Sequence, residues 1–454
     1  MRAETPGFKV SVRDGVVVES RAVVRIDLAM EIGSTSSEIQ VIAATPTMET
    51  ETAQVSDART ARQLRGLPSM SNQETFAYLF TLPGVQSVSI NTYSFNGSRS
   101  TQYEFSIDGI PSPRSSTALG GTHDTFEMVS ELRLHSASNG AEFQSPGAIS
   151  IVTKAGTNRL RGSLYYYHSN SALNARDFFS PKKASNKGHT FGTSFGGPVL
   201  IPKLYDGRDR TFFMLSLWGE RLPGNHEPTT TVPTAAMRRG DFSALAAAIV
   251  DPQTGQQFPG KIIPQDRLSP IALRVQERFY PLPNFGNLSL LTSNNFRTIL
   301  ARRSLQNRWE ARIDQKLGSK NMLYARYSWR GAVQEPAEPL PTIGVRNGYR
   351  RGAAFVLSDT HTFGTALVNE FRYGFQSSPN RVLGPLSGLD VLRYTGIQGV
   401  STSGDYRGMP QFNLTGVTSI GSTAHTIDRY HSVSVADNLA WVRGRHTIKG
   451  GFRL

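Results

Sequence analysis

The stretch that divides this chain runs from Asn139 to His168 and reads NGAEFQSPGAISIVTKAGTNRLRGSLYYYH. Its run AISIVTK (residues 148–154) alternates in polarity and is rich in β-branched side chains, as strands are. The turn-forming AGTN (155–158) ends that run, and a second run, GSLYYYH (162–168), carries tyrosines on both faces. Mixed patterns precede the stretch and long alternating patterns follow it. We therefore expect two architectures that meet here.

Alternation is clearest between residues 307 and 317. Ionisable and apolar side chains take turns there: Arg308, Glu310, Arg312, Asp314 and Lys316 alternate with Trp309, Ala311, Ile313 and Leu317. A row of ionisable side chains needs water or mutual pairing, so it faces neither lipid nor a dry core. The prediction is that Arg308, Glu310, Arg312 and Asp314 face a barrel lumen, while Trp309 and Ile313 face outward. A shift of one residue would reverse every side chain.

Nine segments after the dividing stretch are predicted to be strands. They are residues 162–169, 189–198, 210–221, 305–316, 321–330, 351–363, 366–377, 428–442 and 446–454. Short connections follow the second, fourth, sixth and eighth segments, and the other connections are long. Membrane barrels combine such apolar-out, polar-in strands with short periplasmic turns and long external loops. The predicted fold is mainly β: a small mixed α/β domain, then the first part of an antiparallel transmembrane barrel.

The predicted barrel is incomplete. Nine strands cannot close around a domain of about a hundred residues, because plugged transporters have about 22 strands. Open strand edges do not survive in lipid. The N-terminus, Met1 followed by RAETP, lacks the apolar segment of a signal peptide. We therefore expect a fragment of a longer protein, with both ends missing.

The dividing stretch resembles the junction of plug and barrel in TonB-dependent outer-membrane receptors, in the Oar-like branch with a carboxypeptidase-regulatory-like N-terminal domain. The plug of that family ends in a pattern close to AEYG…GGxxNIVTKSGTN, which this chain matches at residues 141–143 and 147–158. Pro146 replaces the first glycine of the usual pair. The residues that represent this plug-end motif are Gly147, Ile149, Ile151, Thr153, Lys154, Gly156 and Asn158.

The resemblance implies four parts. Residues 1–32 are the remnant of the carboxypeptidase-regulatory-like β-sandwich, with a strand from Val24 to Glu31; 33–58 are a linker; 59–158 are the plug; and 159–454 begin the barrel. Within the plug, the capping box that starts at Ser71 predicts a short helix with Phe76, Leu79 and Phe80 on its apolar face. The pair Asp108-Gly109 predicts a turn.

The linker holds a candidate TonB box, made of Glu38, Ile39, Gln40, Val41 and Ile42. In the family this box adds an extended strand to the sheet of a periplasmic partner. Backbone hydrogen bonds supply the affinity, so the sequence must provide β-propensity and disorder before binding. An ordinary strand of the preceding domain is the alternative. The TonB-box interpretation predicts an extended or poorly ordered segment over residues 34–58, with few contacts to the plug.

Composition sets further bounds. The 454 residues include 49 Lys and Arg, 35 Asp and Glu, and no cysteine, so disulfides and thiolate metal sites are excluded. The charge of +14 fits a polyanion partner, a barrel lumen or contact with lipopolysaccharide. The basic residues are spread over many strands, which argues against nucleic acid. The GTSFG run (192–196) matches a nucleophile elbow, but the GPVLIP that follows cannot open a helix. No catalytic, cofactor or metal residue is predicted.

Two functions are compatible with this sequence. The first is an energy-coupled receptor in the bacterial outer membrane that imports a bulky solute, with a TonB-type transducer as partner and no enzymatic chemistry. Siderophores, glycans and peptides all remain open as the solute. The second is a surface β-protein that binds polyanions or partner proteins without transport.

Overall fold

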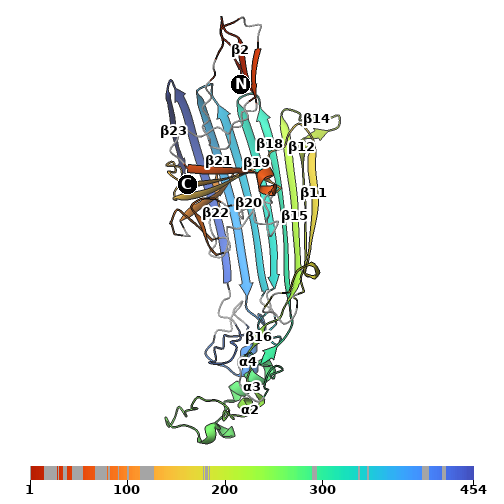
Figure 1. Cartoon of the computed structure of the whole chain (residues 1–454), viewed down its shortest axis with the longest axis vertical. Coiled ribbons are helices and arrows are strands. Elements are labelled where there is room, and N and C mark those ends of the chain that lie inside the picture. Colours follow the sequence, from red (N-terminus) through yellow and green to blue (C-terminus); the bar gives the residue numbers. More distant parts are fainter. Residues whose placement is uncertain are drawn as a thin grey trace.

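The computed structural model describes residues 2–14, 28, 30–33, 38–42, 55–66, 79, 82–89, 92–99, 102–112, 127–176, 178, 183, 185–288, 294–335, 338–344, 347–400, 408–421 and 426–454. A large antiparallel sheet runs through the molecule, with a small domain against one face and a cluster of loops at one end (Figure 1). No helix in the described ranges is long and apolar enough to cross a membrane.

The large sheet has nine strands, each paired antiparallel with the next in sequence. They are β11 (Arg161–Asn170), β12 (Lys187–Pro198), β15 (Thr211–His226), β18 (Leu300–Leu317), β19 (Asn321–Glu335), β20 (Asn347–Thr362), β21 (Leu367–Leu383), β22 (Thr426–Arg443) and β23 (His446–Arg453). The predicted number, order and pairing of strands are confirmed, with β11 and β23 at the two edges. Several strands extend beyond their predicted ends, because pairing continues through polar residues: β18 begins at Leu300 rather than at residue 305.

A second, five-stranded sheet has the order β4-β9-β10-β7-β8. Its strands are β4 (Val55–Thr60), β7 (Tyr103–Ile107), β8 (Ile110–Pro111), β9 (Val129–Ala137) and β10 (Gly147–Thr153), and α1 (Ala61–Gly66), β5 (Val85–Ser89) and β6 (Thr92–Phe95) lie beside it. We call this domain, residues 55–153, the plug. Its apolar core includes Leu79, Leu132 and Ile149, each 0% exposed.

The plug sheet begins at Val55, four residues before the predicted boundary at residue 59, because β4 pairs with β9. Residues 55–58 therefore belong to the plug sheet, and the expectation of few plug contacts fails for them. Apart from Leu79, the helix predicted from the capping box at Ser71 lies outside the described residues.

A three-stranded sheet precedes the plug, in the order β1-β2-β3. It consists of β1 (Arg2–Ala3), β2 (Val10–Asp14) and β3 (Glu38–Ile42), and β3 runs parallel to β2. The candidate TonB box is thus a strand at one edge of this sheet. Most of the strand predicted from Val24 to Glu31 lies outside the described residues.

Short and long connections lie at opposite ends of the large sheet (Figure 1). The short ones are residues 199–210, which hold β13 (Leu200–Ile201) and β14 (Tyr205–Asp206), and residues 318–320, 363–366 and 444–445. The long ones hold η2 (Ser171–Leu173), β16 (Thr229–Thr230), α2 (Ala235–Arg238), η3 (Pro259–Lys261), η4 (Gln265–Arg267), α3 (Pro270–Phe279), β17 (Phe296–Arg297) and α4 (Val391–Thr395).

Three of the long connections share one hydrophobic core, which sequence reasoning missed. Val232, Leu340 and Met409 come from different connections and are buried in the same cluster. The Arg238 guanidinium donates from Nη2 to the carbonyls of Tyr280 and Pro281 at 2.6 Å each, and its burial lowers its pKa. Tyr280 donates to the Thr418 carbonyl at 2.8 Å, and burial raises its pKa to about 12. The loops therefore form one packed unit.

Candidate functional site

The candidate site is the contact between the plug and the polar face of the large sheet, which we call the inner face. The predicted Asp108-Gly109 turn stands at its centre, joining β7 to β8. Both residues have left-handed φ angles, 49° and 77°, as a two-residue hairpin requires. A Cβ on Gly109 would lie 2.2 Å from Nη1 of Arg372, so a side chain there would displace the Arg372 guanidinium.

The Asp108 carboxylate is buried between the plug and two arginines of the barrel strands. Within the plug it accepts hydrogen bonds from the Thr153 N–H at 2.9 Å and the Thr153 hydroxyl at 2.8 Å. From the inner face, Arg326 Nε approaches Oδ2 to 2.9 Å and Arg312 Nη1 approaches Oδ1 to 3.8 Å. Desolvated ions are tolerated only when they are paired in this way.

Asp108, Arg312 and Arg326 belong to a larger group of charged side chains, which we call the ionic cluster. Arg312 binds both oxygens of Asp314 through Nε at 3.1 Å, donates to the Thr153 hydroxyl at 2.7 Å, and stacks 4.0 Å from the Tyr324 ring. Arg326 also lies 3.7 Å from Glu310. The cluster thus joins charges of opposite sign from the plug and from two neighbouring strands.

The four residues predicted to face the lumen all lie on the inner face. Their exposed fractions are 8% for Arg308, 2% for Glu310, 9% for Arg312 and 0% for Asp314. Trp309 and Ile313, of the opposite parity, are 38% and 48% exposed on the outer face. The structure brings Glu310, Arg312 and Asp314 into the ionic cluster, whereas Arg308 lies nearer the loops and stacks on Trp218, 4.5 Å from its ring.

Two more contacts tie the plug to the edges of the large sheet. Arg453 on β23 makes a bidentate pair with Glu104 of the plug, at 2.6 and 3.2 Å. Tyr165 on β11 donates to Glu127 of the plug at 3.0 Å. The plug therefore contacts the inner face at both edges as well as at the centre.

The first part of the plug-end motif lies in β10. A Cβ on Gly147 would come within 2.5 Å of the Phe95 ring, so glycine leaves room for that ring. Ile149 and Ile151 are buried in the plug core, and Thr153 reaches Asp108. Strand β10 therefore connects the apolar core of the plug with the ionic cluster.

The second part of the motif leads from the plug to the barrel. Lys154 donates to the Glu127 carbonyl at 2.7 Å. A Cβ on Gly156 would lie 2.5 Å from the Phe213 carbonyl oxygen, so the chain passes too close to β15 for a side chain. Asn158 accepts from the Asp209 N–H at 2.7 Å, in the turn after β12. Residues 154–158 therefore hold the plug at the end of the large sheet that carries the short turns.

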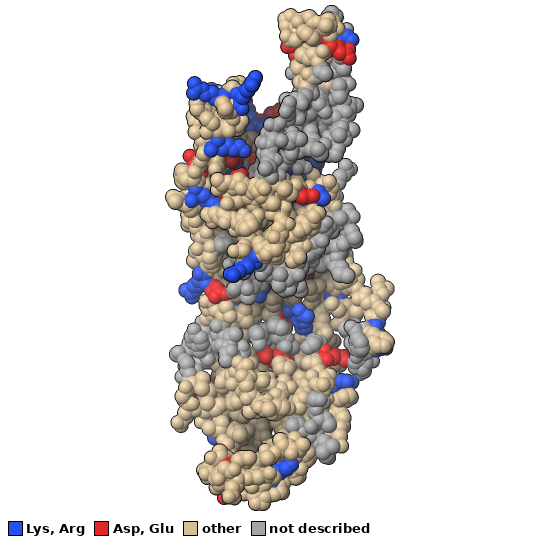
Figure 2. Space-filling model, turned by 60° about the vertical axis from the view of Figure 1, so that its left-hand side comes forward, with Lys and Arg blue, Asp and Glu red and all other residues tan. Residues whose placement is uncertain are grey.

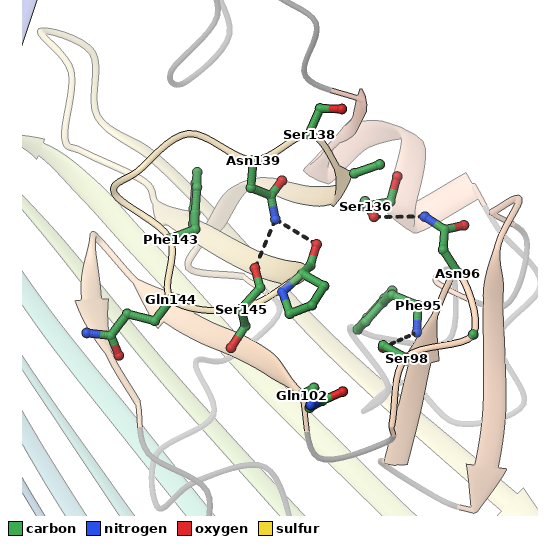
Figure 3. Close-up of a pocket in the computed structure, with 13 residues that line it drawn as sticks. Phe95, Asn96, Ser98, Gln102, Ser136, Ser138, Asn139, Phe143, Gln144 and Ser145 are labelled. Atoms are coloured by element: carbon green, nitrogen blue, oxygen red, sulfur yellow. Dashed lines mark hydrogen bonds between the residues drawn. The ribbon is translucent and has the colours of Figure 1, made fainter.

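A pocket of about 650 Å³ lies within the plug, between the segment after β6 and the loop that joins β9 to β10 (Figure 3). Asn139 holds that loop by donating to the carbonyls of Ser145 at 3.1 Å and Pro146 at 2.7 Å. Asn96 spans the pocket to the Ser136 carbonyl at 2.8 Å. The pocket is lined by uncharged side chains only, so ion pairs contribute nothing to its chemistry.

Sequence reasoning did not find Asp108, Arg326 or Arg372 as members of one site. Each lies in a pattern that predicts local structure, a turn or an alternating strand, and nothing in these patterns specifies partners far apart in sequence. Polar and apolar residues alternate along β19 and β21, and this alternation is the signal that could have found them. It places Arg326 and Arg372 on the same face as Arg312.

Comparison with known proteins adds an independent assignment. Residues 152–454 match the family described as outer membrane beta barrel domain. No curated protein gives a significant match. Among solved structures, the outer membrane transporter YddB from Escherichia coli is 12% identical with a TM-score of 0.52, over 88% of this chain and 47% of that one.

Two further structures resemble the chain less closely. The ferric enterobactin receptor PfeA from Pseudomonas aeruginosa is 10% identical with a TM-score of 0.47, covering 88% of this chain and 48% of that one. The ferric yersiniabactin uptake receptor FyuA from Yersinia pestis is 12% identical with a TM-score of 0.40, covering 88% and 56%. The chain spans about half the length of these proteins. The family match covers most of the chain and agrees with the nine-stranded sheet, so this protein belongs to the outer membrane beta barrel domain family and resides in the bacterial outer membrane.

Proposed function

We propose that this protein is a TonB-dependent outer-membrane receptor that imports a bulky solute, and that energy coupling displaces the plug. The observation that carries the proposal is the chemistry of the contact between the plug and the inner face. It is made by ion pairs and hydrogen bonds such as Asp108–Arg326 and Glu104–Arg453. Such a contact can be opened and re-formed, because water can solvate the separated charges, whereas a permanent contact is usually more apolar.

The edge strand β3 supports the proposed partner. Because the order of its sheet is β1-β2-β3, one side of the β3 backbone has no strand beside it among the described residues. An unpaired strand edge accepts a strand from another protein through backbone hydrogen bonds. A TonB-type periplasmic transducer could therefore pair with residues 38–42 without first unfolding the sheet.

The non-transporting alternative has less support. Binding of polyanions requires a continuous basic surface, whereas the face drawn in Figure 2 shows small scattered groups of both signs. Several arginines that give the chain its positive charge lie on the inner face, where Arg312 and Arg326 are paired with carboxylates.

Proline substitution in β3 should abolish binding of the transducer. The double variant Gln40→Pro/Val41→Pro removes two adjacent N–H donors, which point to opposite sides of a strand, so one of them faces the partner. The expected result is loss of affinity for a purified TonB-type periplasmic domain, measured by titration in detergent. The matched variant Gln40→Ala/Val41→Ala keeps both donors and should bind as the wild type does. Equal binding by both variants would exclude residues 38–42 as the box.

A further inference from the structure

Three arginines lie close together on the inner face, between the ionic cluster and the loops. Arg308 on β18 stands directly opposite Arg330 on β19. Arg350 on β20 pairs with Ala332, two residues further along β19, so it is the diagonal neighbour of Arg330. Directly opposed like charges destabilise a sheet, and diagonal neighbours are still within reach of long side chains. The register thus concentrates positive charge on three adjacent strands.

Around Arg330, the described neighbours compensate this charge only in part. The side-chain oxygen Oε1 of Gln306 is 3.5 Å from Arg308 Nη2 and 3.3 Å from Arg330 Nη2, and the Gln306 side-chain Nε2 donates to Glu220 at 3.0 Å. Glu220 is thus hydrogen-bonded to the arginines only through a neutral amide, and it attracts Arg308 and Arg330 through space. Asp428 occupies the same row, but it is exposed and lies beyond Asn380, to which it is hydrogen-bonded at 3.4 Å.

Arg330 has unused capacity for a ligand. Its Nε is buried and donates to no group among the described residues. A buried guanidinium donor without an acceptor is costly, and a planar anion such as a carboxylate or phosphate can bind two of its N–H groups at once. The position of Arg330 also suits contact with a solute. Arg330 lies on the inner face, between the ionic cluster and the loops.

We propose that Arg330 and Arg350, with Arg308 beside them, bind an anionic group of the imported solute, a carboxylate or a phosphate. This inference rests on the proposed function, since it takes the inner face as the path of the solute. It favours acidic solutes over neutral glycans. Arg330 supplies the bidentate contact, and Arg350 adds charge on the side nearest the loops.

The test measures anion binding and stability in detergent micelles at low salt. Citrate and inorganic phosphate serve as probes and maltotriose as the neutral probe. At least one anion should bind and raise resistance to urea, and its affinity should fall as salt is added. Arg330→Gln should weaken that binding about tenfold or more, and Arg330→Lys should weaken it less, because it keeps the charge. Arg302→Gln, an exposed arginine of the same parity on β18, should bind as the wild type does.

Stability without the anion gives the second readout. If the arginines repel one another, Arg330→Gln should be at least as stable as the wild type when no anion is present. Lower stability of Arg330→Gln without anion would show that a protein carboxylate already neutralises Arg330, and would overturn the inference. Absence of anion binding, or tighter binding of maltotriose, would overturn it as well. Neither result bears on transducer binding by β3, so the proposed function is judged separately.

Discussion

Replacement of Asp108 by alanine is expected to weaken the attachment of the plug by about 3–5 kcal/mol, the usual cost of removing one partner from a buried ion pair. The Asp108 side chain is 2% exposed and faces Arg312 and Arg326, which are 9% and 2% exposed. Without it, two guanidinium groups lose a carboxylate in a site with little water, and Thr153 loses its acceptor. The measurement is the free energy of opening of β7 and β10, obtained by hydrogen exchange in detergent micelles.

A less buried ion pair of the same domain supplies the control. Asp57 lies 2.6 Å from Arg59 in β4, but both side chains are about one-third exposed, at 35% and 34%. Ion pairs that water reaches contribute less than fully buried ones, so Asp57→Ala should lower plug stability much less than Asp108→Ala does. Asp108→Asn should fall between the two, because it removes the charge and keeps an acceptor for Thr153. Equal losses for Asp108→Ala and Asp57→Ala would contradict the assigned role of the cluster.

A disulfide between the plug and β21 is expected to block transport. Ile110 Cγ2 lies 2.4 Å from the position that a Cβ of Gly374 would take, which brings the two Cβ atoms within reach of a disulfide. The chain has no cysteine of its own, so Ile110→Cys/Gly374→Cys can form one bond only. Closing so long a loop stabilises the attached state by about 5–6 kcal/mol in the chain-entropy account, and covalently prevents separation of β8 from β21.

Uptake of a labelled solute by cells with an energised inner membrane measures this effect. The oxidised double variant should not transport, and a reductant should restore transport. Ile110→Cys alone should transport with or without oxidant. Gly374→Cys combined with Ile110→Ala, which makes room for the new side chain, should do the same, and these two controls separate the bond from the substitutions. Wild-type rates in the fully oxidised double variant would mean that solute passes without movement of this part of the plug.

The sequence predicted the large sheet well because its periodicity is a local property. Alternation around Arg312 and the turn at Gly318 specify a strand and its neighbour without reference to the rest of the chain. The short connections then determine the antiparallel order. The lengths of the strands were underestimated, since pairing at the loop end of β18 continues through Arg302 and Arg303, where no apolar alternation marks it.

The site was predictable only in part. The parity of residues 308–314 places their side chains on one face, but their partner Asp108 lies about two hundred positions earlier, in a stretch that predicts nothing beyond a turn. The shared core of the long loops was not predicted, for the same reason. Val232, Leu340 and Met409 are isolated apolar residues in irregular segments, and only the fold brings them together.

Conductance across a planar lipid bilayer tests most directly the central claim that the plug closes the pathway and has to move. The complete outer-membrane protein is inserted, and current is recorded before, during and after exposure to urea, which should release the polar plug contact before it unfolds the barrel. The account predicts a closed protein without urea, stepwise conductance with urea, and closure when urea is removed. Steady conductance of the native protein without urea, or no conductance at any urea concentration that detaches the plug, would contradict it.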